Sequence, residues 1–139
     1  MGIRCFTHIH EMESLGGEVV CTFYRPHGGA PEEHGKYLAD WLSGKRLVNG
    51  IERDFQEGRD HNRAGQMAID LMASIKKQTP CEVFPTGSSG MGEDFVYHIF
   101  FSDGVFSLFC EDCYSRTNIM TVVDEYDSAQ VKKALSVNK

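Results

Sequence analysis

The chain has 139 residues, of which 41% are hydrophobic and 24% are charged, and its formal net charge is -6. A chain of this length can bury one hydrophobic core, so we expect a single domain over residues 1–139. The acidic balance argues against binding along the phosphate backbone of DNA, which needs a basic surface. It leaves room for one small anionic ligand held by a few basic groups.

The apolar stretches of the chain do not reach the length of a membrane span. The most apolar one, residues 96–109, is interrupted by His98, Ser102 and Asp103. The first residues lack the long apolar core and the small-residue cleavage site of a secretory signal. We therefore expect a cytoplasmic protein without membrane contact, in which most of the five cysteines are reduced.

The first half of the chain predicts a β-hairpin followed by two helices. Residues 3–10 alternate, and residues 18–24 are rich in β-branched and aromatic side chains, so we expect them to pair antiparallel. A helix is expected over residues 31–42, with a proline and two glutamates in its first turn. Residues 45–59 are polar and are expected to form a loop. A second helix is expected to begin near Asp60, whose side chain can cap free amides, and to continue to residue 79.

The second half changes to the two-residue period of strands. Asp103 and Gly104 form a strong hairpin signal between two apolar runs. In that register Phe101 faces Phe106, Ile99 faces Leu108 and Tyr97 faces Cys110, which gives one apolar face. The remaining expected elements are a strand at 81–84, a Gly/Ser loop at 85–93, a strand at 118–123 and a helix at 128–135.

These elements predict an α+β fold. We expect an antiparallel sheet of about six strands, two amphipathic helices inserted after the first hairpin, and a short C-terminal helix. The second face of the 96–109 hairpin carries Val96, His98, Phe100 and Phe109, which is more apolar than a solvated surface. It is expected to be a subunit interface or a stacking surface.

A loop with two glycines follows the second expected strand, and Arg25 lies at its mouth. Glycine tolerates positive φ and allows close approach of a ligand to the backbone. An arginine beside such a loop can hold a phosphate through two hydrogen bonds. The alternative is a plain strand-to-helix connection with a surface arginine.

Other residues add to a nucleotide-binding pattern. Phe84 and Pro85 lie beside the glycine-rich loop 87–92, where an aromatic ring can stack on a purine. Asp94 and Asn118 can accept or donate hydrogen bonds to a base or ribose, and Arg25 and Arg116 can pair with phosphates. The loop itself lacks the Lys-Ser/Thr ending of a P-loop.

The sequence contains no complete catalytic or metal-binding set, so we expect no enzyme activity and no cofactor. Cys110 and Cys113 form a single C-x-x-C without the second pair that structural zinc normally requires. His8 and His10 share one face of a strand and support an alternative, a metal-dependent phosphodiesterase-like enzyme that also uses His98. A third possibility is a protein–protein interaction module that uses the apolar hairpin face.

Several ordered blocks resemble a family of small phage and bacterial proteins. The blocks are Gly2-Ile3-Arg4, Phe23-Tyr24-Arg25, the segment from Gly35 to Leu42, Val48-Asn49-Gly50-Ile51 and the helix from Ala64 to Ile75. The chain resembles the phage Thoeris anti-defence sponges of the first described type over about residues 2–101. It departs from the family pattern at residues 27–30 and 63–66.

The resemblance implies a sponge that binds cyclic ADP-ribose isomers, and in some members cyclic oligonucleotides, without cleaving them. It also implies dimers or higher homo-oligomers with ligand pockets near subunit boundaries, acting in the host cytoplasm. The ligand-binding residues expected from the side-chain chemistry remain Arg25, Phe84, Pro85, Asp94, Arg116 and Asn118.

Overall fold

The computed structural model describes residues 2–12, 17–48, 55–102, 104–115 and 117–123, with only the backbone for residues 119–123. Its elements are β1 (Cys5–His10), β2 (Val19–Arg25), a single π-helical turn η2 (Pro31–Gly35), α1 (Lys36–Leu42), β3 (Arg46–Val48), β4 (Asp60–Asn62), α2 (Ala64–Lys76), β5 (Glu82–Phe84), β6 (Phe95–Ser102), β7 (Val105–Asp112) and β8 (Thr117–Val123). The helix expected at 128–135 lies outside the described residues.

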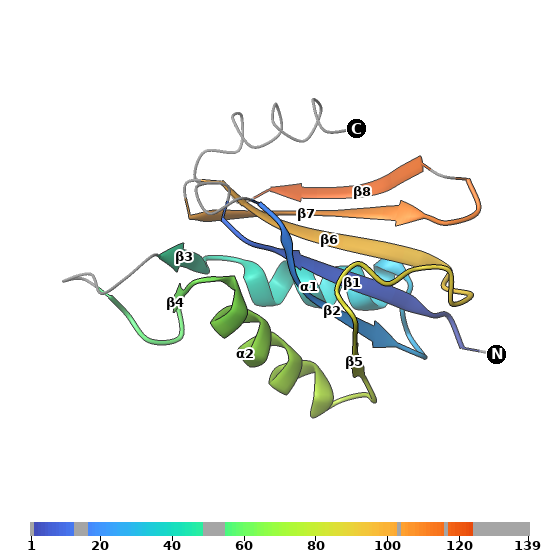
Figure 1. The fold of residues 1–139 in the computed structure, drawn as a ribbon, viewed down its shortest axis with the longest axis horizontal. Coiled ribbons are helices and arrows are strands. Elements are labelled where there is room, and N and C mark those ends of the chain that lie inside the picture. Colours follow the sequence, from blue (N-terminus) through green and yellow to red (C-terminus); the bar gives the residue numbers. More distant parts are fainter. Residues whose placement is uncertain (1, 13–16, 49–54, 103, 116, 124–139) are drawn as a thin grey trace.

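The strands form one mixed sheet in the order β4-β3-β7-β6-β1-β2-β5, and β8 pairs with β7 beside this path. The fold is α+β, as predicted, and Figure 1 shows both α helices on the same side of the sheet. The prediction of an antiparallel sheet was wrong, because β1 pairs parallel to β6 and β3 pairs parallel to β4. The prediction of about six strands missed β3 and β4.

The parallel pairing of β1 and β6 follows from the path of the chain. Strands that run parallel need a crossover connection, and here the chain passes through the helices and β5 before it returns to the free edge of β1. Alternation of side chains has the same two-residue period in both directions of pairing. The sequence therefore predicts that β1 and β6 are strands and leaves their relative direction open.

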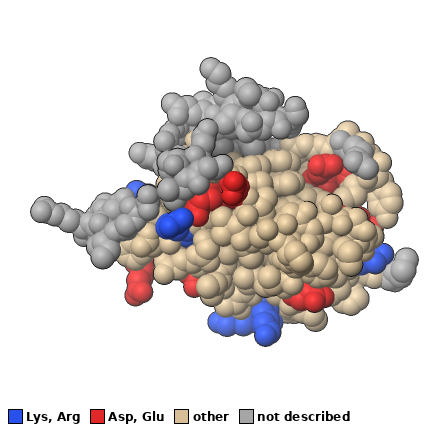
Figure 2. Space-filling model, in the orientation of Figure 1, with Lys and Arg blue, Asp and Glu red and all other residues tan. Residues whose placement is uncertain are grey.

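The charged side chains are dispersed on the surface visible in Figure 2. Most of that face is uncharged, and the Lys, Arg, Asp and Glu residues lie in small separate groups. None of the helices in the described ranges is both long and apolar enough to cross a membrane.

The segment between α1 and α2 differs from the prediction. Residues 45–59 were expected to be a loop, but Arg46–Val48 forms β3, and Asp60 lies in β4 instead of capping a helix. The Asp60 carboxylate accepts hydrogen bonds from Arg59 and from the backbone N–H of Gln56. The helix α2 begins at Ala64, after Arg63 with a positive φ of 75°. These three-residue strands exist because they pair with each other and with the sheet edge, and local propensity does not reveal such pairing.

The predicted β6–β7 hairpin is confirmed in its register. Phe101 pairs with Phe106, Ile99 with Leu108 and Tyr97 with Cys110. Gly104 adopts a φ of 80°, which the tight turn requires.

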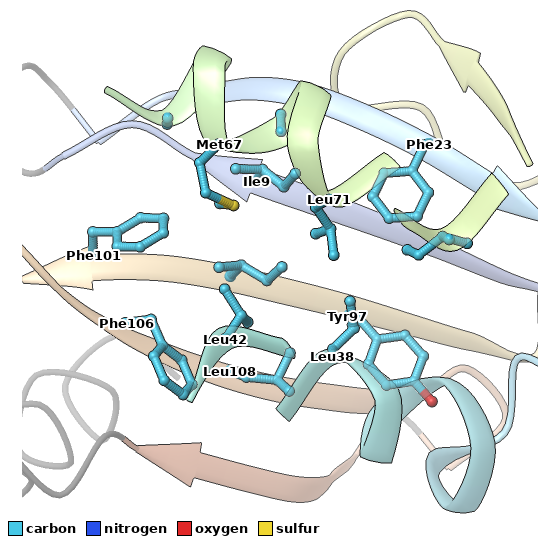
Figure 3. Packing of buried hydrophobic residues seen from close by; sticks show 14 of the residues in the cluster. Ile9, Phe23, Leu38, Leu42, Met67, Leu71, Tyr97, Phe101, Phe106 and Leu108 are labelled. Atoms are coloured by element: carbon cyan, nitrogen blue, oxygen red, sulfur yellow. The ribbon is translucent and has the colours of Figure 1, made fainter. Parts of the chain in front are cut away.

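The core lies between the helices and one face of the sheet. Leu38 and Leu42 of α1 and Met67 and Leu71 of α2 pack toward the apolar side chains of the central strands, as Figure 3 shows. Tyr97 is also buried there, and its hydroxyl donates a 2.7 Å hydrogen bond to the carbonyl oxygen of Gly29. This packing leaves the second face of β1 and β6 available for the site described next.

Candidate functional site

A cavity of about 620 Å³ lies on the face of β1 and β6 that points away from the helices. The side chains on its floor come from three strands, because His8 pairs with His98 across the parallel ladder and β7 adds the neighbouring row. The lining residues are His8, Val19, Val96, His98, Glu111 and Cys113 together with Gly87, Ser89, Gly90, Gly92 and Glu93 of the connecting loop. The glycine-rich loop and the strand face predicted to stack thus form one site.

Flat rings make up much of this strand face. The ring of His98 stacks on Phe109 at 4.8 Å between centroids and on His8 at 5.1 Å. Phe100 continues the row, with His10 stacked on it at 4.0 Å. Rings in this arrangement offer a planar ligand both apolar area and stacking geometry.

The three histidines are held by hydrogen bonds within the protein. His8 Nδ1 lies 2.8 Å from Thr22 Oγ1, and His10 Nε2 lies 3.1 Å from His98 Nδ1. His10 Nδ1 also lies 3.3 Å from the carbonyl oxygen of Gly17. That carbonyl can only accept, so His10 Nδ1 carries a proton there; in the neutral ring Nε2 then accepts from His98.

Burial keeps these histidines uncharged. Desolvation, followed by the nearby His8 and His10, lowers the pKa of His98 to about 3. Desolvation also lowers the pKa values of His8 and His10. Near neutral pH the imidazole rings of the floor are therefore uncharged, and the Glu111 side chain lies beside them in the lining.

The glycine-rich loop is anchored at both ends of the cavity. The backbone N–H of Gly87 donates a 2.9 Å hydrogen bond to Thr22 Oγ1, next to His8. The Glu93 carboxylate accepts from the N–H groups of Gly90 at 3.0 Å and Met91 at 2.8 Å. Adjacent N–H groups that point at one anion form the kind of concavity that binds phosphates. In this structure the carboxylate of Glu93 takes that position.

Arg4 lies at the rim of the cavity, beside the loop. A methyl group added at Gly92 would stand 3.2 Å from Arg4 Nη1, so the guanidinium packs directly on this glycine. The backbone N–H of Arg4 donates to Asp94 Oδ2 at 2.9 Å, and the hydroxyl of Tyr114 donates to Asp94 Oδ1 at 2.8 Å. These two hydrogen bonds lower the pKa of Asp94. The aspartate thus fastens the end of the loop to the start of β1.

Arg25 lies on the other face of the sheet, away from this cavity. Its side chain is 13% exposed, its Nε donates to the carbonyl oxygen of His27 at 2.6 Å, and its Nη1 donates to His34 Nδ1 at 3.1 Å. Glu33 Oε2 lies 3.9 Å from Nη2. The guanidinium predicted to hold a phosphate therefore organises the 26–34 segment.

Three other predicted ligand residues, Phe84, Pro85 and Asn118, lie on segments next to cavity-lining residues. Phe84 lies on the cavity side of the sheet, opposite Thr22 in the ladder, and covers Phe6 edge-on at 5.2 Å. The carbonyl of Pro85 accepts two hydrogen bonds from Ser88 and so starts the loop. Asn118 pairs with the cavity residue Glu111 across β7 and β8, and Arg116 lies outside the described residues.

The two cysteines of the C-x-x-C segment, Cys110 and Cys113, favour the protonated thiol form. Burial raises the pKa of Cys110 to about 12 and that of Cys113 to about 11, whereas metal ligands and nucleophiles need a thiolate. Within the described residues, no group of three or more His, Cys, Asp or Glu side chains could hold a metal ion.

Sequence reasoning did not find Arg4 and Glu93 as site residues, and it treated the three histidines only as an alternative metal or catalytic set. Alternation along each strand predicted which face His8 and His98 occupy. That the two side chains lie next to each other depends on the parallel pairing of β1 and β6. No family model, curated protein or solved structure is detectably similar to the chain.

Proposed function

We propose that the protein binds and sequesters a cyclic nucleotide messenger in the cavity under the glycine-rich loop, without cleaving it. The resemblance to the anti-defence sponges suggests cyclic ADP-ribose isomers, with cyclic oligonucleotides as further ligands. The base would stack on the ring surface around His98, and a phosphate would lie against the loop.

The observation that carries the proposal is the position of the Glu93 carboxylate. It is an anion bound by two loop N–H groups at the edge of a surface of stacked neutral rings. A nucleotide combines the same two parts, a planar ring and an anionic group. A phosphate would take over the N–H groups of Gly90 and Met91 as Glu93 turns away, and Arg4 at the rim would offset part of its charge.

The state of the histidines supports binding in preference to hydrolysis. A general base at neutral pH needs a pKa near the working pH, and the pKa of His98 is lowered to about 3. His10 has hydrogen-bond partners at both ring nitrogens. The alternative, a metal-dependent phosphodiesterase that uses His8 and His10, predicts a stoichiometric metal after purification, which elemental analysis measures.

Assembly is part of the proposal. The resemblance implies ligand pockets near subunit boundaries, and we propose a homo-oligomer in which a second copy covers the open side of the cavity. Light scattering coupled to size-exclusion chromatography measures this directly, with and without ligand.

The experiment that tests the function combines binding with recovery of the ligand. Purified protein is titrated with cyclic ADP-ribose isomers and cyclic dinucleotides by calorimetry, then heated, and the released ligand is analysed by mass spectrometry. Binding should stabilise the fold by about 4 kcal/mol at a ligand concentration one thousand times the dissociation constant. Intact ligand should be recovered. Recovery of hydrolysed ligand, or no depletion of free ligand, would overturn the proposal.

Two substitutions localise the ligand. Glu93→Gln removes the competing charge from the loop and should tighten binding of an anionic ligand by several fold. Glu82→Gln, which removes the same charge from the exposed strand β5, is the matched control and should have little effect. His98→Ala removes the central ring of the floor and should weaken binding at least tenfold. Equal effects of the two glutamate substitutions would contradict the assigned position.

A further inference from the structure

A second cavity, of about 750 Å³, lies next to α1, β4 and the start of α2. Trp41, His61 and Asp70 contribute to its lining, one from each element. Within the described chain, its lining and that of the cavity under the glycine-rich loop have no residue in common. Its volume is in the range that holds a small organic molecule.

His61 is held in this lining with one nitrogen unused. Its side chain is 6% exposed, and its Nδ1 lies 2.9 Å from Asp70 Oδ2. The aspartate accepts the proton on Nδ1, so in the neutral ring Nε2 is left as an acceptor. Nε2 is buried and has no hydrogen-bond partner in the described structure. A buried acceptor without a donor lowers stability, and a ligand that brings an N–H group would satisfy it.

Trp41 already holds a cation on its ring. Lys45 Nζ lies 4.7 Å from the ring centroid and donates a 2.5 Å hydrogen bond to the carbonyl oxygen of Gly58. The ring of His61 lies 5.7 Å from the same tryptophan. A lysine on a flexible stem can move away from such a face when a better-matched cation arrives.

The charges around the cavity favour a cation as well. Among the described residues, its lining contains the carboxylates of Glu57, Asp60 and Asp70 and the ammonium of Lys45. Asp60 stays ionised, because hydrogen bonds from Arg59 lower its pKa to about 2. Even when Arg59 is counted as the partner of Asp60, negative charge exceeds positive charge among these described groups.

We propose that this cavity binds a small organic cation with a planar guanidinium group. The flat group replaces the Lys45 ammonium on the face of Trp41 and directs N–H donors to His61 Nε2 and to the carboxylates of the lining. A guanidinium fits because it combines charge, a stacking face and five N–H donors in one plane. Since Nε2 is buried in this conformation, side chains around it must move in the binding step.

The chain offers a specific reporter, because Trp41 is its only tryptophan. Intrinsic fluorescence is titrated with L-argininamide and, as the uncharged analogue of the same size, L-citrullinamide. We expect a saturable change with argininamide and at least tenfold weaker binding of citrullinamide. A peptide with one internal arginine is the third ligand. Binding of that peptide alone would overturn the assignment to a small molecule.

Substitutions test each part of the argument. His61→Phe keeps a ring but removes the acceptor and should weaken argininamide binding about tenfold. Lys45→Met keeps the apolar stem, removes the competing ammonium and should tighten binding by several fold. Lys36→Met, on the exposed side of α1, makes the same charge change elsewhere and serves as control.

Several results would overturn the proposal. These are no saturable change with argininamide, equal affinity for citrullinamide, or weaker binding in Lys45→Met than in Lys36→Met. Lys45→Met keeps the proposal testable if His61→Phe does not fold. Glu93→Gln should leave argininamide binding unchanged, so the two sites can fail independently.

Discussion

Acid should destabilise this protein well above the pH at which carboxylates titrate, because two buried histidines are held neutral. His34 is fully buried, and its Nδ1 accepts a hydrogen bond from Arg25 while its Nε2 donates to Thr7 Oγ1 at 2.8 Å. Protonation of Nδ1 would replace that hydrogen bond by two facing cations. Burial first, and the charge of Arg25 second, lower the pKa of His34 to about 3. The pKa of His98, in the cavity floor, is also lowered to about 3.

The sign and size of the effect follow from linkage. Each histidine has a pKa of 6.5 in the unfolded chain and about 3 in the folded protein, so the unfolded state binds more protons between these values. The stability that their neutral state supports is present above the unfolded pKa and is lost as the pH falls toward 3. Between pH 7 and pH 5 each histidine should lower the free energy of unfolding by about 2 kcal/mol, and the two together should lower it by about 4 kcal/mol.

Urea unfolding followed by circular dichroism at pH 7 and pH 5 measures this loss. The variant His98→Phe retains the stacking on Phe109 and removes one titrating group, so its loss over the same interval should be about 2 kcal/mol. A loss below about 1 kcal/mol in the unsubstituted protein would refute the reasoning. An equal loss in both proteins would show that His98 does not contribute.

Three further substitutions, together with Gly65→Ala in α2 as a control, test how the loop after β2 is held. Gly29→Ala would place a methyl group 2.9 Å from the Cβ and 3.0 Å from the backbone nitrogen of Cys5, so it should lower the free energy of unfolding by about 1–3 kcal/mol in urea melts. Gly65→Ala in α2 would place a methyl group at an ordinary contact distance of 3.8 Å from Val20 Cγ1 and should instead stabilise by roughly 0.5 kcal/mol; a similar loss at both glycines would contradict the steric argument. Tyr97→Phe removes the buried hydrogen bond to Gly29 and should cost about 1–2 kcal/mol by the same assay, whereas no change would mean that water replaces the hydroxyl. Arg25→Ala should lower the melting temperature and leave nucleotide affinity unchanged after correction for the folded fraction, and calorimetry showing a selective loss of affinity would return Arg25 to the site.

The candidate site was accessible to sequence reasoning only in pieces. The glycine-rich loop, the ring-bearing strand face and the positions of Phe84 and Asp94 followed from local chemistry. The position of Arg25 was not predicted correctly. Its side chain lies opposite Cys5 in the ladder and therefore on the face of the sheet that packs in the core. Sequence reasoning predicts the type of a side chain and which neighbours along the strand share its face. Which of the two faces becomes the core depends on which strands and helices pack together.

Local sequence patterns were sufficient to predict the elements whose signals are local. The β6–β7 hairpin and its register follow from Asp103-Gly104 and from alternation, and the apolar stripe of α2 follows from helical spacing. The tertiary structure decided the rest. The parallel pairing of β1 with β6 brings His8 beside His98, and the hydrogen bond between His10 and His98 joins the same two strands. These contacts join segments far apart in the chain, and their free energy depends on loop closure and packing that no local pattern encodes.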